Sequence, residues 1–257
     1  MAASSYDDIP DFGLLYDHVP LYEVRTDVGF YVEEAKSAGG AVLELGCGTG
    51  RILLPIARAG WSVVGVDSSR EMLERCRAKL ATEAAAVQSR VTLQQLDIHD
   101  FNLAAGFALI IAPFRVVQHL TTVDDQLRFL AAVGRHLAPG GRFAFDVFNP
   151  RFDLMTRADG VEVEDTPEQR LPDGRTFSRG WRIARVRWVD QVNEAELIYY
   201  VDGKRYVQAF HMRWYLPAEL RHLLVRAGFR VREMYGDFAR GPLVDGAPEQ
   251  VVIAERV

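Results

Sequence analysis

The residues of this sequence whose spacing points most directly to chemistry are three glycines. Residues 43–51 read LELGCGTGR, so Gly46, Gly48 and Gly50 alternate with other residues directly after a short apolar run. Glycine allows tight turns and lets a ligand approach the backbone closely. The spacing therefore predicts a ligand-binding loop at the end of a buried strand.

The spacing of the glycines also discriminates between possible ligands. A dinucleotide-binding loop reads G-x-G-x-x-G, but here Gly50 comes one residue early and Arg51 takes its place. A P-loop ends in Gly-Lys-Ser or Gly-Lys-Thr, and Arg51 followed by Ile52 does not supply that ending. Both phosphate-binding alternatives are weakened. A nicotinamide-dependent oxidoreductase stays open as a minor alternative.

Three carboxylates follow predicted strands and would surround the same ligand. Glu44 lies just before the glycines, Asp67 ends the next strand and Asp97 ends the third. Open α/β sheets bind ligands at the carboxyl ends of their strands. Carboxylates repel a phosphate, but they suit a ligand with an ammonium, a sulfonium and an adenine amine. This charge distribution favours S-adenosylmethionine.

Strands and helices alternate behind these residues up to Pro150. Apolar runs predict strands at residues 41–45, 61–67, 91–97, 107–113 and 142–150. Helical spacing predicts helices at residues 51–59, 70–80 and 122–137. Ser68 followed by Glu71 predicts a capping box at the start of the second helix. The alternation is typical of the α/β fold class, with a parallel sheet covered on both faces.

The pattern changes after Pro150. Asp173-Gly174 and Asp202-Gly203 each separate two strand-like runs, which is a strong hairpin pattern. We expect about four antiparallel strands between residues 161 and 214, followed by a helix and two final strands. The predicted organisation is a helical N-terminal lead-in at 1–40, a core at 41–150 and 215–257, and an antiparallel β insertion at 151–214.

Together these motifs resemble those of the class I S-adenosylmethionine-dependent methyltransferases. The matching segments are residues 44–50, 65–73, 96–101, 109–120 and 137–148. The resemblance implies a Rossmann-like, doubly wound, seven-stranded and mostly parallel sheet. Its last strand would be antiparallel and would lie between the fifth and sixth. The cofactor would be S-adenosylmethionine, with S-adenosylhomocysteine as product, and the insertion would form a lid over the substrate.

The resemblance also implies roles for individual residues. Asp67 would hold the ribose, Met72 would border the adenine, Asp97 would lie near the adenine amine, and Ile98 would give its amide to the ring. Tyrosines of the lead-in would close over the cofactor: Tyr6, Tyr16 and Tyr22. The expected cofactor-binding residues are Tyr16, Glu44, Gly46, Cys47, Gly48, Gly50, Asp67, Ser68, Met72, Asp97, Ile98 and Ala112.

His119 is the catalytic candidate. It lies shortly after the fourth strand, where it could accept a proton from a substrate hydroxyl or ammonium; a packing role is the alternative. No other general-base motif is evident. The expected substrate-binding residues are Phe114, Arg115, His211 and Tyr215. Arginines of the insertion could hold a carboxylate or phosphate of the substrate: Arg182, Arg185, Arg187, Arg205 and Arg213.

The implied reaction is an in-line displacement at the sulfonium methyl. It needs a nucleophile held about 3 Å from that methyl, and no metal. We expect transfer to nitrogen or oxygen, and less readily to carbon, of a small-molecule acceptor. No N-P-P-Y-like sequence follows the fourth strand, which argues against methylation of DNA bases. A protein or RNA methyltransferase and a non-catalytic S-adenosylmethionine-binding protein are the alternatives.

Composition limits the partners and the compartment. The 257 residues carry a net charge of −5, without the basic footprint of most nucleic-acid binders. The two cysteines form no zinc-type spacing and no disulfide framework. No signal peptide is evident, and no apolar run reaches the roughly 18 residues that span a bilayer. We therefore expect a cytoplasmic monomer or homodimer without DNA or membrane partners.

Overall fold

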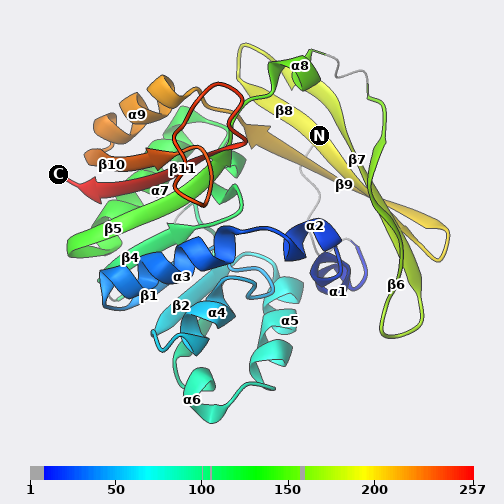
Figure 1. Cartoon of the computed structure of the whole chain (residues 1–257), viewed down its shortest axis with the longest axis horizontal. Helices are drawn as coiled ribbons and strands as arrows, with labels where there is room; N and C mark the ends of the chain where they lie inside the picture. Colours follow the sequence, from blue (N-terminus) through cyan, green and yellow to red (C-terminus); the bar gives the residue numbers. More distant parts are fainter. Residues whose placement is uncertain (1–8, 100, 105, 157–159) are drawn as a thin grey trace.

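The computed structural model describes residues 9–99, 101–104, 106–156 and 160–257. Its main body is a seven-stranded sheet with the order β10-β11-β5-β4-β1-β2-β3 (Figure 1). The strands are β1 (Val42–Leu45), β2 (Val63–Asp67), β3 (Val91–Gln95), β4 (Phe107–Ala112), β5 (Leu137–Phe148), β10 (Phe229–Tyr235) and β11 (Glu249–Arg256). β11 runs antiparallel to both β5 and β10, whereas β1 to β5 are parallel. The predicted fold class is confirmed, including the place of the last strand.

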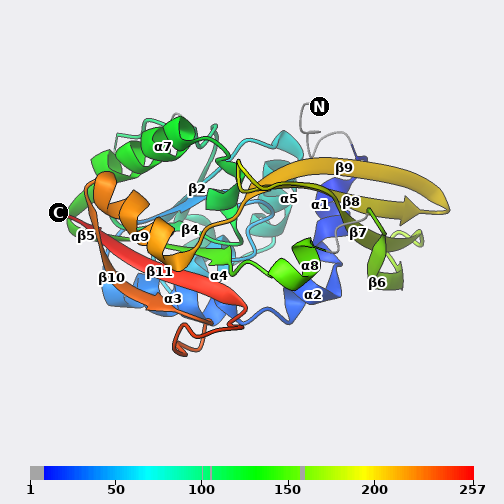
Figure 2. The same ribbon diagram turned by 90° about the horizontal axis from the view of Figure 1, so that it is seen from above.

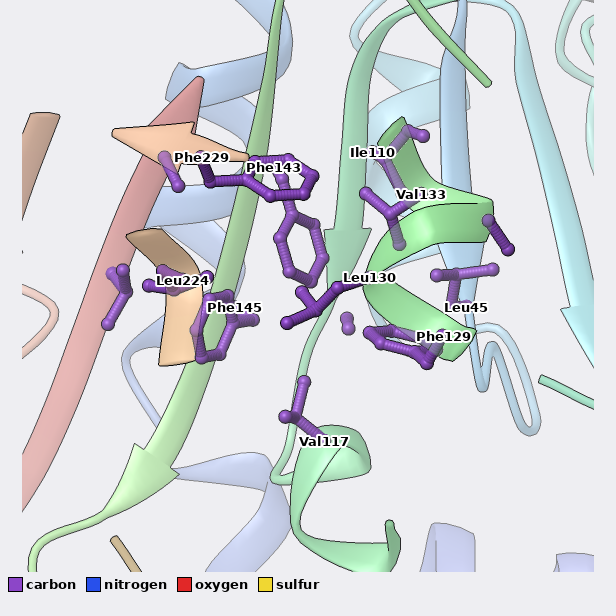
Figure 3. Close-up of a cluster of buried hydrophobic side chains, with 14 of the residues drawn as sticks. Leu45, Ile110, Val117, Phe129, Leu130, Val133, Phe143, Phe145, Leu224 and Phe229 are labelled. Atoms are coloured by element: carbon purple, nitrogen blue, oxygen red, sulfur yellow. The ribbon is translucent and has the colours of Figure 1, made fainter. Parts of the chain in front are cut away.

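Helices cover both faces of this sheet (Figures 1 and 2). One face carries α7 (Val123–His136) and α9 (Pro217–Arg226), and the other carries α3 (Asp27–Ala38), α4 (Leu53–Arg58) and α5 (Arg70–Leu80). The short α6 (Ala85–Gln88) leads into β3. Figure 3 shows how Phe129 and Leu130 of α7 pack against Phe143 and Phe145 of β5. The strands between the helix layers are apolar runs because both of their faces are buried.

One helix start differs from the prediction. Ser69, not Ser68, caps α5, because its side chain accepts a hydrogen bond from the backbone N–H of Met72 at 3.2 Å. Ser68 is exposed. Glu71 does not complete a box with Ser68; its carboxylate accepts the backbone N–H of Gly13 at 2.9 Å. Glu71 therefore connects α5 to the N-terminal lead-in.

A second, four-stranded sheet is the insertion sheet, with the order β6-β7-β8-β9. Its strands are β6 (Val163–Arg170), β7 (Thr176–Arg187), β8 (Val192–Val201) and β9 (Lys204–Arg213), and α8 (Phe152–Met155) precedes them. All neighbours are antiparallel, which confirms the predicted hairpins. Asp202 and Gly203 join β8 to β9 with φ angles of 47° and 76°. Positive φ at both positions is what a tight two-residue hairpin turn requires.

The register of the insertion sheet defines two faces. Residues directly opposite each other on neighbouring strands point to the same side. Tyr199 is opposite Tyr206, and Leu197 is opposite Gln208. We call this side the inner face, because Tyr199 is fully buried there against the lead-in. The other side, which carries Val207, is the outer face.

The part of the lead-in that precedes α3 lies between the core and the insertion sheet (Figure 1). It contains α1 (Phe12–Asp17) and α2 (Pro20–Glu23). Phe12 and Leu15 are buried in one cluster with Met72 of α5 and with Phe177 and Tyr199 of the insertion sheet. The two sheets are thus joined through a layer of N-terminal residues. None of the helices in the described ranges is both long and apolar enough to cross a membrane.

Candidate active site

The glycine loop connects β1 to α4 at the carboxyl edge of the sheet. The φ angles of Gly46, Gly48 and Gly50 are 70°, 52° and 84°, a region that favours glycine. A Cβ atom on Gly46 would lie 2.5 Å from Cγ2 of Val116, in the segment after β4. The N–H groups of Gly46 and Cys47 both donate to the carbonyl of Val66, at 2.8 and 2.9 Å. The loop therefore has a fixed shape that side chains could not adopt.

Two of the predicted strand-end carboxylates lie at this loop. Asp67 accepts hydrogen bonds from the backbone N–H groups of Gly48 and Ser69, at 2.8 and 2.9 Å. Glu44 is 2 % exposed, and its Oε2 atom has no hydrogen-bond partner among the described residues. Burial raises the pKa of Glu44 well above its usual range, although Arg51 opposes this shift. A cationic ligand in the loop would supply the partner that this carboxyl lacks.

These residues fit S-adenosylmethionine. Its ammonium and sulfonium suit the orphaned carboxyl of Glu44, and its ribose hydroxyls suit Asp67. Met72, which is 5 % exposed, has its methyl 3.3 Å from where a Cβ of Gly48 would be. When bound, the cofactor would supply an electrophilic methyl group on a positively charged sulfur. The individual assignments to this cofactor stay predictions.

The remaining predicted cofactor residues are spread along the strand ends. Ala112 is buried at the end of β4, and Ile98 is half-buried against the core. The side chain of Asp97 is 68 % exposed and accepts hydrogen bonds from the backbone and the ring of His99. Partial burial opposes the change, but these bonds lower the pKa of Asp97. Asp97 thus lies at the exposed rim of this edge.

Cys47 is a packing residue in this structure. It is 4 % exposed, and a Cβ atom on Gly65 would lie 2.9 Å from its sulfur. Burial raises the pKa of its thiol well above the usual value. A buried thiol that keeps its proton is not a nucleophile.

An aromatic cluster faces the segment after β4. The rings of Tyr16 and Tyr22 are 4.6 Å apart, and Phe114 lies 4.9 Å from Tyr22 and 6.3 Å from Tyr16. Arg51 and Arg25 lie over the Phe114 ring, at 5.3 and 5.0 Å. Two of the predicted lead-in tyrosines therefore meet a predicted substrate residue. Tyr6 lies outside the described residues.

Asp17, next to Tyr16, ties α1 to the glycine loop. Its carboxylate accepts hydrogen bonds from the hydroxyl of Thr49 at 2.6 Å, from Arg75 at 2.8 Å and from Lys79 at 3.0 Å. Thr49 belongs to the loop, and the two basic residues belong to α5. The lead-in is thereby held across the carboxyl edge of β1.

Sequence reasoning missed a buried ionic cluster beneath Phe114. Asp146 of β5 is fully buried, and it accepts hydrogen bonds from the hydroxyl of Tyr31 at 2.7 Å, the N–H of Phe114 at 2.8 Å and Arg25 at 2.9 Å. Burial raises the pKa of Asp146, and Arg25 opposes this effect. Arg25 also pairs with Glu249 at 2.9 Å. The sequence indicates this cluster only through Asp146, which is a single carboxylate within the apolar run of β5.

The cluster supports a strained turn. Phe114 and its neighbour Arg115 have φ angles of 57° and 70°, where residues with a side chain are rare. Such a conformation costs about 1–3 kcal/mol per residue and persists only where its surroundings fix it. The hydrogen bond to Asp146 and the pairing of Arg115 with Glu249 at 3.1 Å provide that support. The predicted substrate residues Phe114 and Arg115 are therefore held in place.

His119 ends the 3₁₀ helix η2 (Val116–His119), which packs against β9. Its ring centre lies 6.3 Å from that of Phe210 on the inner face. Burial lowers the pKa of His119 to about 4, and His99 contributes in the same direction. A hydrogen bond with the backbone of His211 opposes the shift. The imidazole is therefore neutral at physiological pH.

Two other predicted substrate residues do not reach this region. Tyr215 is fully buried in the core cluster with Leu220 and Leu224. His211 is opposite Glu194 on the outer face, because one residue separates it from Phe210 in the strand. It is the backbone of His211, and not its imidazole, that meets His119.

The arginines expected to hold a substrate anion also lie outside the site. The register places all five on the outer face. Arg182 pairs with Glu196 at 2.6 Å, Arg187 with Glu194 at 3.4 Å, and Arg213 with Glu219. In the described parts of the chain, no three His, Cys, Asp or Glu side chains group as metal ligands.

Comparisons with known proteins agree with this geometry. Residues 42–141 match the family model of the methyltransferase domain. The chain is 30% identical over 222 residues to cypemycin N-terminal methyltransferase of Streptomyces sp, covering 85% of this chain and 84% of that protein. It is 27% identical over 175 residues to dTDP-3-amino-3,4,6-trideoxy-alpha-D-glucopyranose N,N-dimethyltransferase of Streptomyces venezuelae, covering 63% of this chain and 68% of that protein.

The fold is also that of a solved methyltransferase. The crystal structure of an S-adenosylmethionine-dependent methyltransferase from Clostridium acetobutylicum superposes with a TM-score of 0.76. The match covers 98% of both chains at 19% identity, including the insertion. Family model, relatives and fold, together with the glycine loop and its carboxylates, lead to one conclusion: this chain belongs to the class I S-adenosylmethionine-dependent methyltransferases.

Proposed function

We propose that this enzyme methylates an amine nitrogen of a small molecule, bound between the carboxyl edge of the core and the insertion sheet. The observation that carries the proposal is the place of His119, which ends η2 with its ring 6.3 Å from that of Phe210 on the insertion sheet. Burial at this place lowers the pKa of its imidazole to about 4. Such a group is too weak a base to deprotonate an aliphatic alcohol. An amine can lose its proton to solvent before it binds, so it needs no strong base in the site.

The aromatic cluster supports the same choice. Transfer to an amine leaves positive charge on the product nitrogen. An aromatic face attracts a cation with about 0.5–2 kcal/mol per contact when the cation is shielded from water. Arg25 and Arg51 already lie over Phe114, and Arg179 lies over Tyr22, so Tyr16 is the ring of this cluster that we assign to the product cation. Neutral His119 can accept a hydrogen bond and so orient the nucleophile. Two relatives, by their names, act at an N-terminus and at an amino sugar nitrogen.

The test is a mass-spectrometric screen with matched acceptors. Cyclohexylamine and cyclohexanol differ only in the reacting group, as do glucosamine and glucose. The relatives' acceptor types, a peptide with a free N-terminus and a dTDP-linked 3-amino sugar, complete the panel. We expect the mass of one or two methyl groups to appear on amines alone. Transfer to the alcohols would contradict the proposal.

A control separates binding from turnover. Calorimetric titration with S-adenosylmethionine should give micromolar binding in the same preparation. Binding of the cofactor without methylation of any amine in the panel would count against the proposal and for a different acceptor class. His119→Asn retains a hydrogen-bonding side chain without the imidazole, and we expect its kcat on amines to fall about tenfold.

A further inference from the structure

We propose that Gln208 and Asn193, on the inner face of the insertion sheet, recognise the methyl acceptor through its O–H and N–H groups. This inference rests on the proposed function, and it specifies the acceptor as a molecule rich in hydrogen-bond donors, such as an amino sugar or another amino polyol. The two carboxamides are specificity residues in this proposal. They do not take part in the transfer itself.

The first argument is an unmet hydrogen-bonding need. Gln208 is 2 % exposed and Asn193 is 6 % exposed. Among the described residues, neither Oε1 of Gln208 nor Oδ1 of Asn193 has a hydrogen-bond partner. A buried polar atom without a partner destabilises the folded protein, so native proteins contain few of them. Two on one face of one small sheet indicate a missing ligand.

The second argument is their placement. Gln208 lies on β9 between Phe210, whose ring is near His119, and Tyr206, which joins the cluster with Tyr199 and the lead-in. All of these residues share the inner face, because alternate residues of a strand point to the same side. β9 also packs against η2, directly after the β4 strand end. Gln208 therefore faces the region between His119 and the aromatic cluster.

The third argument is the charge of the inner face. Arg179 lies there and is 2 % exposed. Its Nε and Nη2 atoms both donate to the carboxylate of Asp165 at 2.9 Å, and its Nη1 atom donates to the hydroxyl of Tyr22. Its positive charge is thus balanced within the protein. The six other arginines of the sheet lie on the outer face: Arg170, Arg182, Arg185, Arg187, Arg205 and Arg213. The one further cation that the register places on this face among the described residues is Lys204, at the hairpin end of β9, where its Nζ atom lies 4.9 Å over the Tyr206 ring. Around Gln208 and Asn193 the inner face therefore offers neutral carbonyl oxygens, which accept hydrogen bonds from donors.

The spacing of the two carboxamides bears on acceptor size. Asn193 is opposite Met212, and Gln208 is opposite Leu197, so four residue steps along β8 separate the two positions. At about 3.3 Å per residue this is roughly 13 Å. An acceptor that contacts both would be longer than one sugar ring. A single-ring probe therefore tests Gln208 first.

The test uses glucosamine and cyclohexylamine as probes, since both carry an amine on a six-membered ring and only glucosamine has hydroxyls. Affinities are measured by ligand-observed NMR on the full chain saturated with S-adenosylhomocysteine. We expect the wild type to bind glucosamine about tenfold more tightly. Gln208→Met, which keeps the length of the side chain, should abolish the preference. Val207→Thr, on the outer face of the same strand, should retain it.

Thermal melting distinguishes recognition from a structural role. Removing a buried carboxamide whose Oε1 atom has no partner among the described residues should leave the melting temperature of Gln208→Met equal to or above that of the wild type. A lower melting temperature together with an unchanged probe preference would overturn the inference, and so would a wild type without any preference. If Gln208→Met loses the preference but no amine is methylated, the recognition site stands and the proposed reaction fails. If amines are methylated and Gln208→Met keeps the preference for glucosamine, the proposed reaction stands and the recognition site fails.

Discussion

At the scale of single residues, the site depends on polar groups whose partners are fixed by the backbone. Asp67 is held by two N–H groups, so its carboxylate is oriented before a ligand arrives. Glu44 is buried without a complete set of partners. His119 is neutral because it is shielded from water. These three side chains come from β1, from the end of β2 and from η2.

Asp67→Ala should weaken binding of S-adenosylmethionine by about 10- to 100-fold, since hydrogen bonds to a charged group contribute roughly 1.5–3 kcal/mol. The substitution removes the ribose partner and also frees the N–H of Gly48. Isothermal titration measures the effect. Asp124→Ala, an exposed residue in the first turn of α7, is the matched control and should bind as the wild type does. An unchanged affinity in Asp67→Ala would contradict the assigned site.

His119 should make the protein less stable in acid. Its pKa of about 4 in the folded protein lies below the usual value near 6.5, so the unfolded chain binds more protons between these two values. Its contribution to stability is therefore present above about pH 6.5 and is lost as the pH falls through about 4. The loss should approach roughly 3 kcal/mol. Urea unfolding of the wild type and of His119→Gln at pH 7 and pH 4.5 measures the contribution of His119 to the free energy of unfolding. The same pH dependence in both proteins would contradict this contribution.

At the scale of elements, the turn after β4 is the part that the rest of the site positions. Phe114 and Arg115 are strained, and the buried Asp146 of the neighbouring β5 holds them. Arg25 of the lead-in reaches the same carboxylate and so couples a third segment to the turn. The turn is thus fixed by residues of β5, of β11 and of the lead-in, and not by its own sequence.

Asp146→Asn should preserve the shape of this turn in part but remove the charge that pairs with Arg25. Breaking a buried ion pair costs about 3 kcal/mol or more, which chemical unfolding would detect. We expect kcat to fall more than the affinity for S-adenosylmethionine, because Asp146 supports Phe114 and not the glycine loop. Asp153→Asn, which breaks an exposed pair with Arg151, is the control. A selective loss of cofactor affinity would argue against this positioning role.

The elements of the core could be predicted because each is specified locally. Buried parallel strands are apolar runs, and Asp202-Gly203 suits a two-residue turn wherever it occurs. The ionic cluster could not be predicted, because Arg25 lies 121 positions from Asp146 and 224 from Glu249. Gln208 is a second case, because this polar residue shares one face of β9 with Tyr206 and Phe210. A polar residue in an apolar stripe is visible in sequence, but only the fold shows what it faces.

At the scale of the whole molecule, the lead-in is the layer that joins two sheets. α1 contacts α5 through Asp17 and Glu71, and it contacts the insertion sheet through Phe12. Because α1 is a single helix of 6 residues, a substitution that breaks its contact with the insertion sheet should also displace its contact with α5, and the reverse should hold as well. The cytoplasmic location and the monomeric or homodimeric state stay predictions. Sedimentation of the full chain would test the oligomeric state.

Tyr199→Ala tests this coupling. Tyr199 is fully buried, and its ring meets that of Phe12 at 5.5 Å, so truncation should cost about 3–5 kcal/mol. We expect weaker binding of S-adenosylmethionine as well, although Tyr199 belongs to the insertion sheet. Tyr200→Ala, the next residue and on the outer face, should have a much smaller effect on both quantities. Equal effects of the two substitutions, measured by melting and titration, would show that the lead-in does not transmit the change.

The contacts of Asp17 with Arg75 and Lys79 bear on the rate of turnover. These pairs are partly exposed, at 34 % and 30 % for the basic side chains, so dissolved ions weaken them. If departure of the spent cofactor requires α1 to leave α5, each catalytic cycle must break both pairs. Turnover at saturating substrate should then rise with ionic strength, whereas Asp17→Asn should turn over faster at low salt and respond little to added salt. The rate-limiting step would then be the separation of α1 from α5, and its rate would depend on ionic strength.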